Sequence, residues 1–195
     1  GDKIKKTIEA DFKGEPIEIR RVEMVGPQVG KDLQWKALLA IFYSMIGIVI
    51  YVAWRFQFKW GIAAIIALAH DVLITLGAFA ITGREFTLPV LAAVLTIVGF
   101  SINDTIVTFD RVRENLRLKN KETFESIVNI SINETLSRTF LTSFTVLVIT
   151  LILFIYGGEV IHDFAFALLV GFIAGVYSSI YIAAPILIFW KEKKK

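Results

Sequence analysis

The stretch Ser101-Ile-Asn-Asp-Thr105, continued by Phe109-Asp-Arg-Val-Arg-Glu-Asn115, decides the fold class of this chain. It places Asp104 inside an apolar segment that runs over residues 86–109. Six residues separate Asp104 from Asp110, where the segment meets water, so a helical rise of about 1.5 Å per residue puts Asp104 roughly 9 Å deep. A carboxylate in lipid is costly and usually faces a bundle interior, a proton relay or a partner charge. We therefore predict a functional carboxylate within a membrane bundle; a simple hydrogen bond to a neighbouring helix is the alternative.

The composition indicates a membrane protein. Apolar residues make up 55% of the chain, and the mean hydropathy is +0.65. Crossing a hydrocarbon core about 30 Å thick takes about 20 helical residues. Five apolar segments approach or exceed this length, at residues 37–53, 61–81, 86–109, 139–156 and 164–190. The fold class predicted is an all-α membrane protein with five transmembrane helices within residues 36–190.

Several classes of chemistry find no support in the sequence. The chain has no cysteine, which excludes disulfides, thiol catalysis and cysteine-ligated metals. It also lacks a phosphate-binding glycine loop, a metal-ligand cluster and a Ser-His-Asp set. The net charge of +3 suits membrane topology better than nucleic-acid binding. We expect no enzymatic activity, no cofactor, no metal and no nucleic-acid partner.

Lysine and arginine in the short loops predict the orientation. By the positive-inside rule, loops rich in these residues face the cytoplasm. The basic set consists of Arg55, Lys59, Arg111, Arg113, Arg117, Lys119, Lys121 and the tail 191–195. Of the two turns on the opposite side, one holds Arg84 as its only basic residue. The other holds Glu159 and Asp163 and no basic residue. Residues 111–137 and the tail are therefore expected inside, and residues 1–35 outside.

Residues 1–35 read as the remnant of an extracytoplasmic α/β domain and its linker. Residues 2–12 have a helical pattern, and Ile17 to Met24 suggest a strand with a register break. Gly26-Pro27 and Gly30 supply turn chemistry before the first span. One helix and one strand cannot bury a core of their own. We interpret the chain as a fragment whose natural N-terminus, with at least one more span, is missing.

Two further polar groups are candidates for the interior of the bundle. His70 and Asp71 fall near the middle of the segment 61–81, the most expensive depth for a charge. A structural role in tying helices together and a place in a proton path are equally open for this pair. Arg138, at the entrance of the fourth apolar segment, lies at nearly the same predicted depth as Asp104 and is its natural counter-ion. The alternative is that Arg138 only anchors the span at the membrane surface.

Three other patterns predict helix arrangement. The block 110–121 is expected to continue the third span beyond the membrane, and residues 122–135 form an amphipathic pattern that fits a membrane-surface helix or a partner contact. In the last span, small residues recur every four positions at Gly171, Gly175, Ser179 and Ala183. Such a stripe allows close helix contact, either within the bundle or with a partner subunit.

Four ordered motifs carry a resemblance to a known family. They are VEMVGPQVGKDL at 22–33, AHDVLITLG at 69–77, VGFSINDTIVTFDRVRENLR at 98–117 and NETLSRTFLTS at 133–143. The chain resembles the SecF family, membrane subunits of the bacterial Sec protein-export machinery. That family is similar to half of a resistance-nodulation-division transporter, with six spans and a large outer domain between the first two. The resemblance implies that the five segments here are the second to sixth spans.

The resemblance also implies function, partners and site residues. It points to an accessory subunit of the bacterial cytoplasmic membrane that uses the proton gradient to promote polypeptide export. SecD, the SecYEG translocon, the exported unfolded polypeptide and the lipid bilayer are the implied partners. Asp104 and Arg138 match family positions implicated in proton movement, and Asp71, His70 and Asn103 complete the candidate relay. A proton-coupled small-molecule transporter is the alternative, and a purely structural scaffold ranks third.

Overall fold

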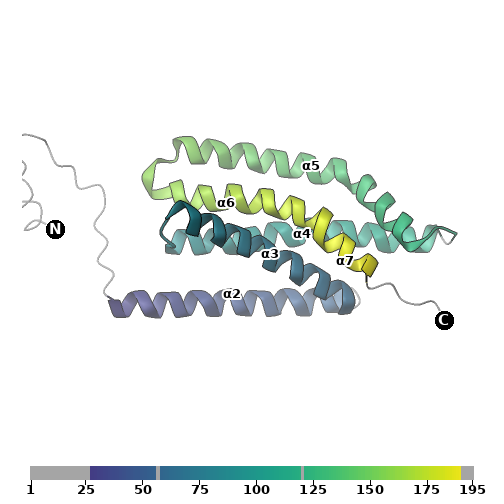
Figure 1. The fold of residues 1–195 in the computed structure, drawn as a ribbon, viewed down its shortest axis with the longest axis horizontal. Helices are drawn as coiled ribbons and strands as arrows, with labels where there is room; N and C mark the ends of the chain where they lie inside the picture. Colours follow the sequence, from purple (N-terminus) through teal and green to yellow (C-terminus); the bar gives the residue numbers. More distant parts are fainter. Residues whose placement is uncertain (1–26, 56–57, 120, 190–195) are drawn as a thin grey trace, which may run out of the picture. The chain divides into compact units, whose positions relative to one another are not determined.

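The computed structural model of the protein describes residues 27–55, 58–119 and 121–189. The chain divides into two compact units, Gly1–Lys36 and Ala37–Lys195. The described residues form helices joined by short turns, without a strand among them. The elements, as labelled in Figure 1, are α2 (Pro27–Arg55), α3 (Phe58–Thr82), α4 (Leu88–Leu118), α5 (Phe124–Tyr156), α6 (Gly158–Ser178), the π-helical turn Ser179–Ala183 and α7 (Ala184–Phe189).

Helices α4 and α6 form the central pair of the second unit. Each contacts the other and also packs against α3 and α5. Close approach depends on two glycines of α6: a Cβ on Gly171 would overlap the Ile97 side chain, and one on Gly175 would lie 3.2 Å from the Cβ of Ser101. The small-residue stripe predicted for the last span therefore packs within the bundle at these two positions.

Long apolar helices confirm the all-α membrane class. Four helical stretches of the described chain are long and apolar enough to cross a membrane: Phe58–Thr82, Leu88–Leu118, Phe124–Tyr156 and Ile161–Phe189. The predicted first span, residues 37–53, corresponds to a shorter apolar stretch, Leu39–Val52. Large apolar side chains lie exposed on the outer faces of the helices, among them Phe140, Leu141, Phe144 and Ile149 on α5. Exposed apolar surface of this extent is typical of a protein that contacts lipid or other membrane proteins.

The predicted linker differs from the structure. Most of the predicted α/β remnant falls on residues 1–26, which lie outside the described residues. The turn expected around Gly30 is wrong, because Pro27 opens helix α2 and Gly30 lies within it. Proline suits the first helical position, where its missing N–H has no intrahelical partner. A single glycine weakens a helix by only about 1 kcal/mol, which a helix of 29 residues can absorb.

The amphipathic helix predicted at 122–135 is present from Phe124 onward, but it does not lie apart from the bundle. It is the first part of α5, a single helix of 33 residues with Thr123 as its N-cap. No glycine or proline interrupts residues 124–156, so the helix continues into the apolar segment. Its apolar side, including Ile127 and Val128, packs on Val112 of α4 and Ala184 of α7. This face is buried inside the protein and is not free for a membrane surface or a partner.

A cluster of charged and polar groups fastens the beginning of α5 to the end of α4. Helix α4 runs to Leu118, as predicted for block 110–121. The Glu134 carboxylate accepts hydrogen bonds from Asn115 Nδ2 at 2.7 Å, Arg111 Nε at 2.6 Å and Lys119 Nζ at 3.1 Å. These donors, Asn115 foremost and then Arg111 and Lys119, lower the pKa of Glu134 to about 2. Glu134 therefore links the two helices where both extend beyond their apolar segments.

Replacing Glu134 with Gln should lower the thermal unfolding temperature at neutral pH, because Gln cannot pair with Arg111 and Lys119. A lowered folded-state pKa stabilises the fold fully above the ordinary value of 4.5, and this contribution fades as the pH falls towards about 2. The difference in unfolding temperature between wild type and Glu134→Gln should therefore shrink below about pH 4.5. The exposed Glu85, which has no ion pair in the described part of the chain, provides the control Glu85→Gln. A difference that does not change with pH would contradict the assignment.

Candidate functional site

Asp71 lies at the centre of a buried polar cluster that joins three helices. Its side chain is fully buried on α3. The Ser101 hydroxyl of α4 donates to Oδ2 at 2.6 Å, and the Ser178 hydroxyl of α6 donates to the same oxygen at 2.8 Å. Nδ1 of His70 lies 3.1 Å from Oδ1. Each carboxylate oxygen thus has at least one partner, as a buried carboxylate requires.

Asp104 is the second buried carboxylate and is held more loosely. It is 4% exposed on α4, and the Ser143 hydroxyl of α5 donates to its Oδ2 at the long distance of 3.5 Å. Thr105, the next residue, shares a hydrogen bond of 3.1 Å between its hydroxyl and that of Ser179. Hydroxyls from α5 and from the π-helical turn therefore meet consecutive residues of α4. Asp104 lies inside the bundle, as the sequence predicts.

Arg138 does not form an ion pair with Asp104 in this structure. Its side chain is exposed on α5, and no ion pair joins it to a carboxylate among the residues that the structure describes. Arg138 lies five residues before Ser143 on α5, which is roughly 7.5 Å along the helix axis. Thr139 and Ser143, one helical turn apart on α5, are both buried, and the Ser143 hydroxyl is the one that reaches Asp104. The two charges belong to one region of the bundle without direct contact.

The remaining sequence candidates are placed differently. His70 contacts Asp71, as described above, and its ring centroid lies 6.1 Å from that of Tyr177 on α6. With its side chain 29% exposed, His70 forms the outer edge of the Asp71 cluster. Asn103 is exposed on α4. The structure therefore groups His70 with Asp71 and leaves Asn103 on the surface of the described chain.

Sequence reasoning missed the part played by Ser178 and the π-helical turn. The sequence feature that could have predicted the π-helical turn is Pro185. A proline cannot donate to the carbonyl four residues earlier, here that of Tyr181, and its ring crowds that carbonyl. The π-helical turn Ser179–Ala183 contains Tyr181, ends two residues before Pro185 and widens the helix. Both Ser178 and Ser179 are consequently buried and reach different partners on α3 and α4.

The two buried carboxylates are surrounded mainly by hydroxyl groups. Among the described residues, no group of three or more histidine, aspartate and glutamate side chains could hold a metal ion. The buried polar groups instead combine the carboxylates of Asp71 and Asp104 with serine and threonine hydroxyls, which can both donate and accept hydrogen bonds. Such groups can take up, pass on and release protons. Asp71 has hydroxyl partners on α4 and α6, and Asp104 has one on α5.

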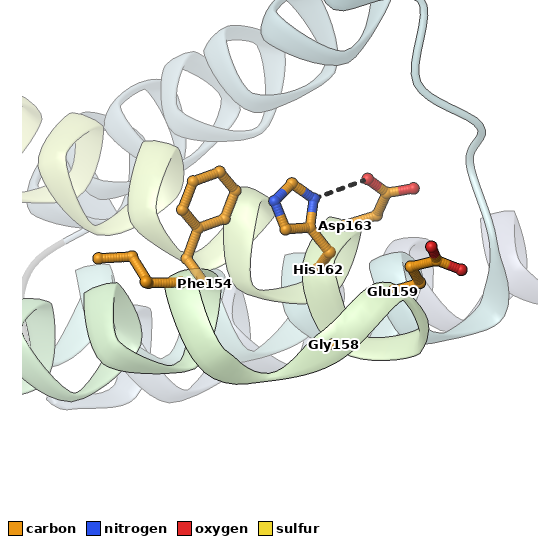
Figure 2. Close-up of a pocket in the computed structure, with 6 residues that line it drawn as sticks. Phe154, Gly158, Glu159, His162 and Asp163 are labelled. Carbon is orange, nitrogen blue, oxygen red and sulfur yellow. Dashed lines mark ion pairs between the residues drawn. The ribbon is translucent and has the colours of Figure 1, made fainter.

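A pocket of about 390 Å³ lies elsewhere, at the turn between α5 and α6. Figure 2 shows its lining side chains, with the His162 ring between Phe154 and Asp163. The ring stacks on Phe154 at a centroid distance of 4.2 Å. Arg84, from the turn between α3 and α4, pairs with Asp163, lies 3.0 Å from His162 Nδ1 and stacks over Phe166. Most polar groups here are paired with one another, so the pocket ties two turns together and no ligand is indicated.

Comparisons with known proteins agree on one family. The family model described as protein export membrane protein SecD/SecF, C-terminal, matches residues 4–193. The chain is 51% identical to the protein translocase subunit SecF of Desulfurispirillum indicum, over 97% of this chain and 61% of the relative. It is 48% identical to that of Koribacter versatilis, over 95% of this chain and 46% of the relative. The chain thus spans less than two thirds of these relatives.

A solved structure gives the same result. The crystal structure of SecDF, a translocon-associated membrane protein from Thermus thermophilus, matches with a TM-score of 0.83 and 47% sequence identity. The match covers 87% of this chain and 24% of that one. The family model, the relatives and the architecture all point the same way. The chain belongs to the SecD/SecF family of protein export membrane proteins.

Proposed function

We propose that the protein is an accessory subunit of the Sec translocase that uses the proton gradient to promote polypeptide export across the bacterial cytoplasmic membrane. The observation that carries the proposal is the placement of Asp104: a buried carboxylate with one long hydrogen bond, in a chain of an export family. The implied partners are SecD, the SecYEG translocon and the exported unfolded polypeptide. The names of the relatives favour this function over the alternative of small-molecule transport.

A proton on Asp104 would change which packing of the helices is preferred. When charged, the carboxylate needs donors or a cation, and among the described residues Ser143 supplies one weak hydrogen bond. Arg138 can then be drawn towards it along α5. When protonated, Asp104 no longer attracts the guanidinium, and the two helices are free to repack. Such a change of partners biases a two-state arrangement, which the outer domain of the full-length protein would convert into movement.

The proposal includes the membrane arrangement. Residues 37–53 supply a fifth span in addition to the four long apolar helices, and residues 1–35 comprise the remnant of an outer α/β domain and its linker. Residues 111–137 and the C-terminal tail face the cytoplasm. The relay residues are Asp104 and Arg138, with Asp71, His70 and Asn103 as further members. Support comes from the basic residues that cluster at one set of helix ends.

In the full-length parent, Asp104→Asn should abolish the stimulation of export by the proton gradient while the protein still inserts into the membrane. Asn keeps the size and hydrogen bonding of the side chain but cannot bind a proton at neutral pH. Export into inverted membrane vesicles, with and without a gradient, measures the effect. Asp110→Asn makes the same chemical change six residues further along α4, at a partly exposed residue paired with Arg55, and should retain most of the stimulation. Full stimulation in Asp104→Asn would reject the proton-coupling role.

Single cysteines in this cysteine-free chain test the topology. Glu85 and Lys121 are exposed in turns at opposite ends of α4. Glu85→Cys should react with a membrane-impermeant thiol reagent only from the outside of sealed cells, and Lys121→Cys only from the cytoplasmic side of inverted vesicles. Glu85 is preferable to the neighbouring Gly83, whose φ of 65° would strain any side chain. Labelling of both cysteines from the same side would contradict the membrane arrangement.

A further inference from the structure

Ser178 differs from the other hydroxyls around Asp71 because it has two acceptors within reach. Its Oγ lies 2.8 Å from Asp71 Oδ2 and 3.2 Å from the carbonyl oxygen of Gly175. A hydroxyl has one hydrogen, so it can donate to only one of them fully at a time. Ser101 Oγ, in contrast, donates to Asp71 Oδ2 at 2.6 Å, and no second acceptor for it is found in the described chain.

The packing of α6 brings the Ser178 hydroxyl close to the Asp71 carboxylate. Gly175 lies one helical turn earlier, and a Cβ there would be 3.7 Å from Asp71 Oδ2 and 3.2 Å from the Cβ of Ser101. This glycine lets α6 approach the carboxylate. The π-helical turn begins directly after Ser178, so the last α-helical residue of α6 is the one that faces Asp71. Ser178 is fully buried.

We propose that Ser178 is a positioning residue whose hydroxyl changes acceptor when Asp71 takes up a proton. With Asp71 charged, Ser178 donates to Oδ2. When a proton supplied by the gradient binds Oδ2, the Ser178 hydroxyl turns to the Gly175 carbonyl. Its oxygen then accepts the new hydrogen bond from the Asp71 O–H. No bond between heavy atoms breaks, and both protonation states keep their hydrogen bonds.

This exchange makes Asp71 a second proton-binding carboxylate, separate from Asp104, and the inference rests on the proposed proton-coupled function. Without this exchange the protonated state of Asp71 would be disfavoured. A protonated carboxyl that faces two donors leaves its own hydrogen without an acceptor. The titratable group that touches Asp71 in the described part of the chain is His70, at Oδ1. Ser101 of α4 and Ser178 of α6 are neutral hydroxyls, so His70 is the ionisable neighbour of Asp71.

Infrared difference spectroscopy of the full-length protein in liposomes tests the exchange. The C=O stretching band of protonated Asp71 is identified as the band that Asp71→Asn removes when the pH is lowered. Ser178→Ala should move this band to higher frequency, because the Asp71 O–H loses its acceptor. Ser178→Thr keeps a hydroxyl on the same carbon and should leave the band near its wild-type position. Ser179→Ala is the matched control, since this equally buried serine bonds to Thr105 and not to Asp71.

The outcomes separate this inference from the proposed function. A band that depends on Asp71 and shifts only in Ser178→Ala supports the exchange, whatever the export activity of the variant. An unchanged band in Ser178→Ala, or no acid-dependent band that Asp71→Asn removes, overturns it. The export assay on Asp104→Asn tests the proposed function independently. Thermal unfolding of Ser178→Ala and Ser179→Ala should show similar small losses, so a purely structural effect would not reproduce the selective band shift.

Discussion

The need to satisfy two carboxylates inside an apolar helix bundle governs this structure. An ionised carboxylate without donors in such an environment costs several kcal/mol. Asp71 meets this need with serines from two other helices, and Asp104 meets it only partly with Ser143. The same hydrogen bonds that offset burial also determine which helices must be neighbours. In membranes, where the hydrophobic effect does little to hold helices together, polar contacts and close packing of small residues supply specificity.

The backbone of the last span allows close contact with the two buried carboxylates and the hydroxyls around them. Gly171 and Gly175 allow α6 to lie close to α4, so that hydroxyls reach the carboxylates directly. Pro185 follows a π-helical turn that buries Ser178 and Ser179 together. The cluster around Glu134 fastens α4 to α5 beyond the apolar segments, while the Arg84 cluster ties the turns at the other end. The bundle is therefore fastened at both ends of α4 and polar in the middle, where Asp104 is loosely held.

Much of this arrangement could be predicted from the sequence. Hydropathy and helix length identified the long apolar helices, and the burial of Asp71 and Asp104 followed from their place within them. The continuous α5 could have been predicted from the absence of a breaker in residues 124–156; an amphipathic pattern alone does not reveal which surface covers the apolar face. The pairing of Ser101 and Ser178 with Asp71 could not be predicted, because it depends on how three helices rotate against one another. Arg138, placed opposite Asp104 by depth, is exposed and pairs with no carboxylate of the described residues, because depth does not determine the direction of a side chain.

Proton coupling of the proposed kind requires a buried carboxylate to change partners when it gains or loses a proton. The distance between the Asp104 carboxyl carbon and the Arg138 guanidinium carbon tests it most directly. Solid-state NMR of the full-length protein in liposomes, labelled at these two carbons, can measure this distance at alkaline and at acidic pH. We expect the two carbons to lie close together while Asp104 is charged and to separate once it is protonated. An identical distance in both protonation states, with Asp104 shown to titrate between them, would contradict it.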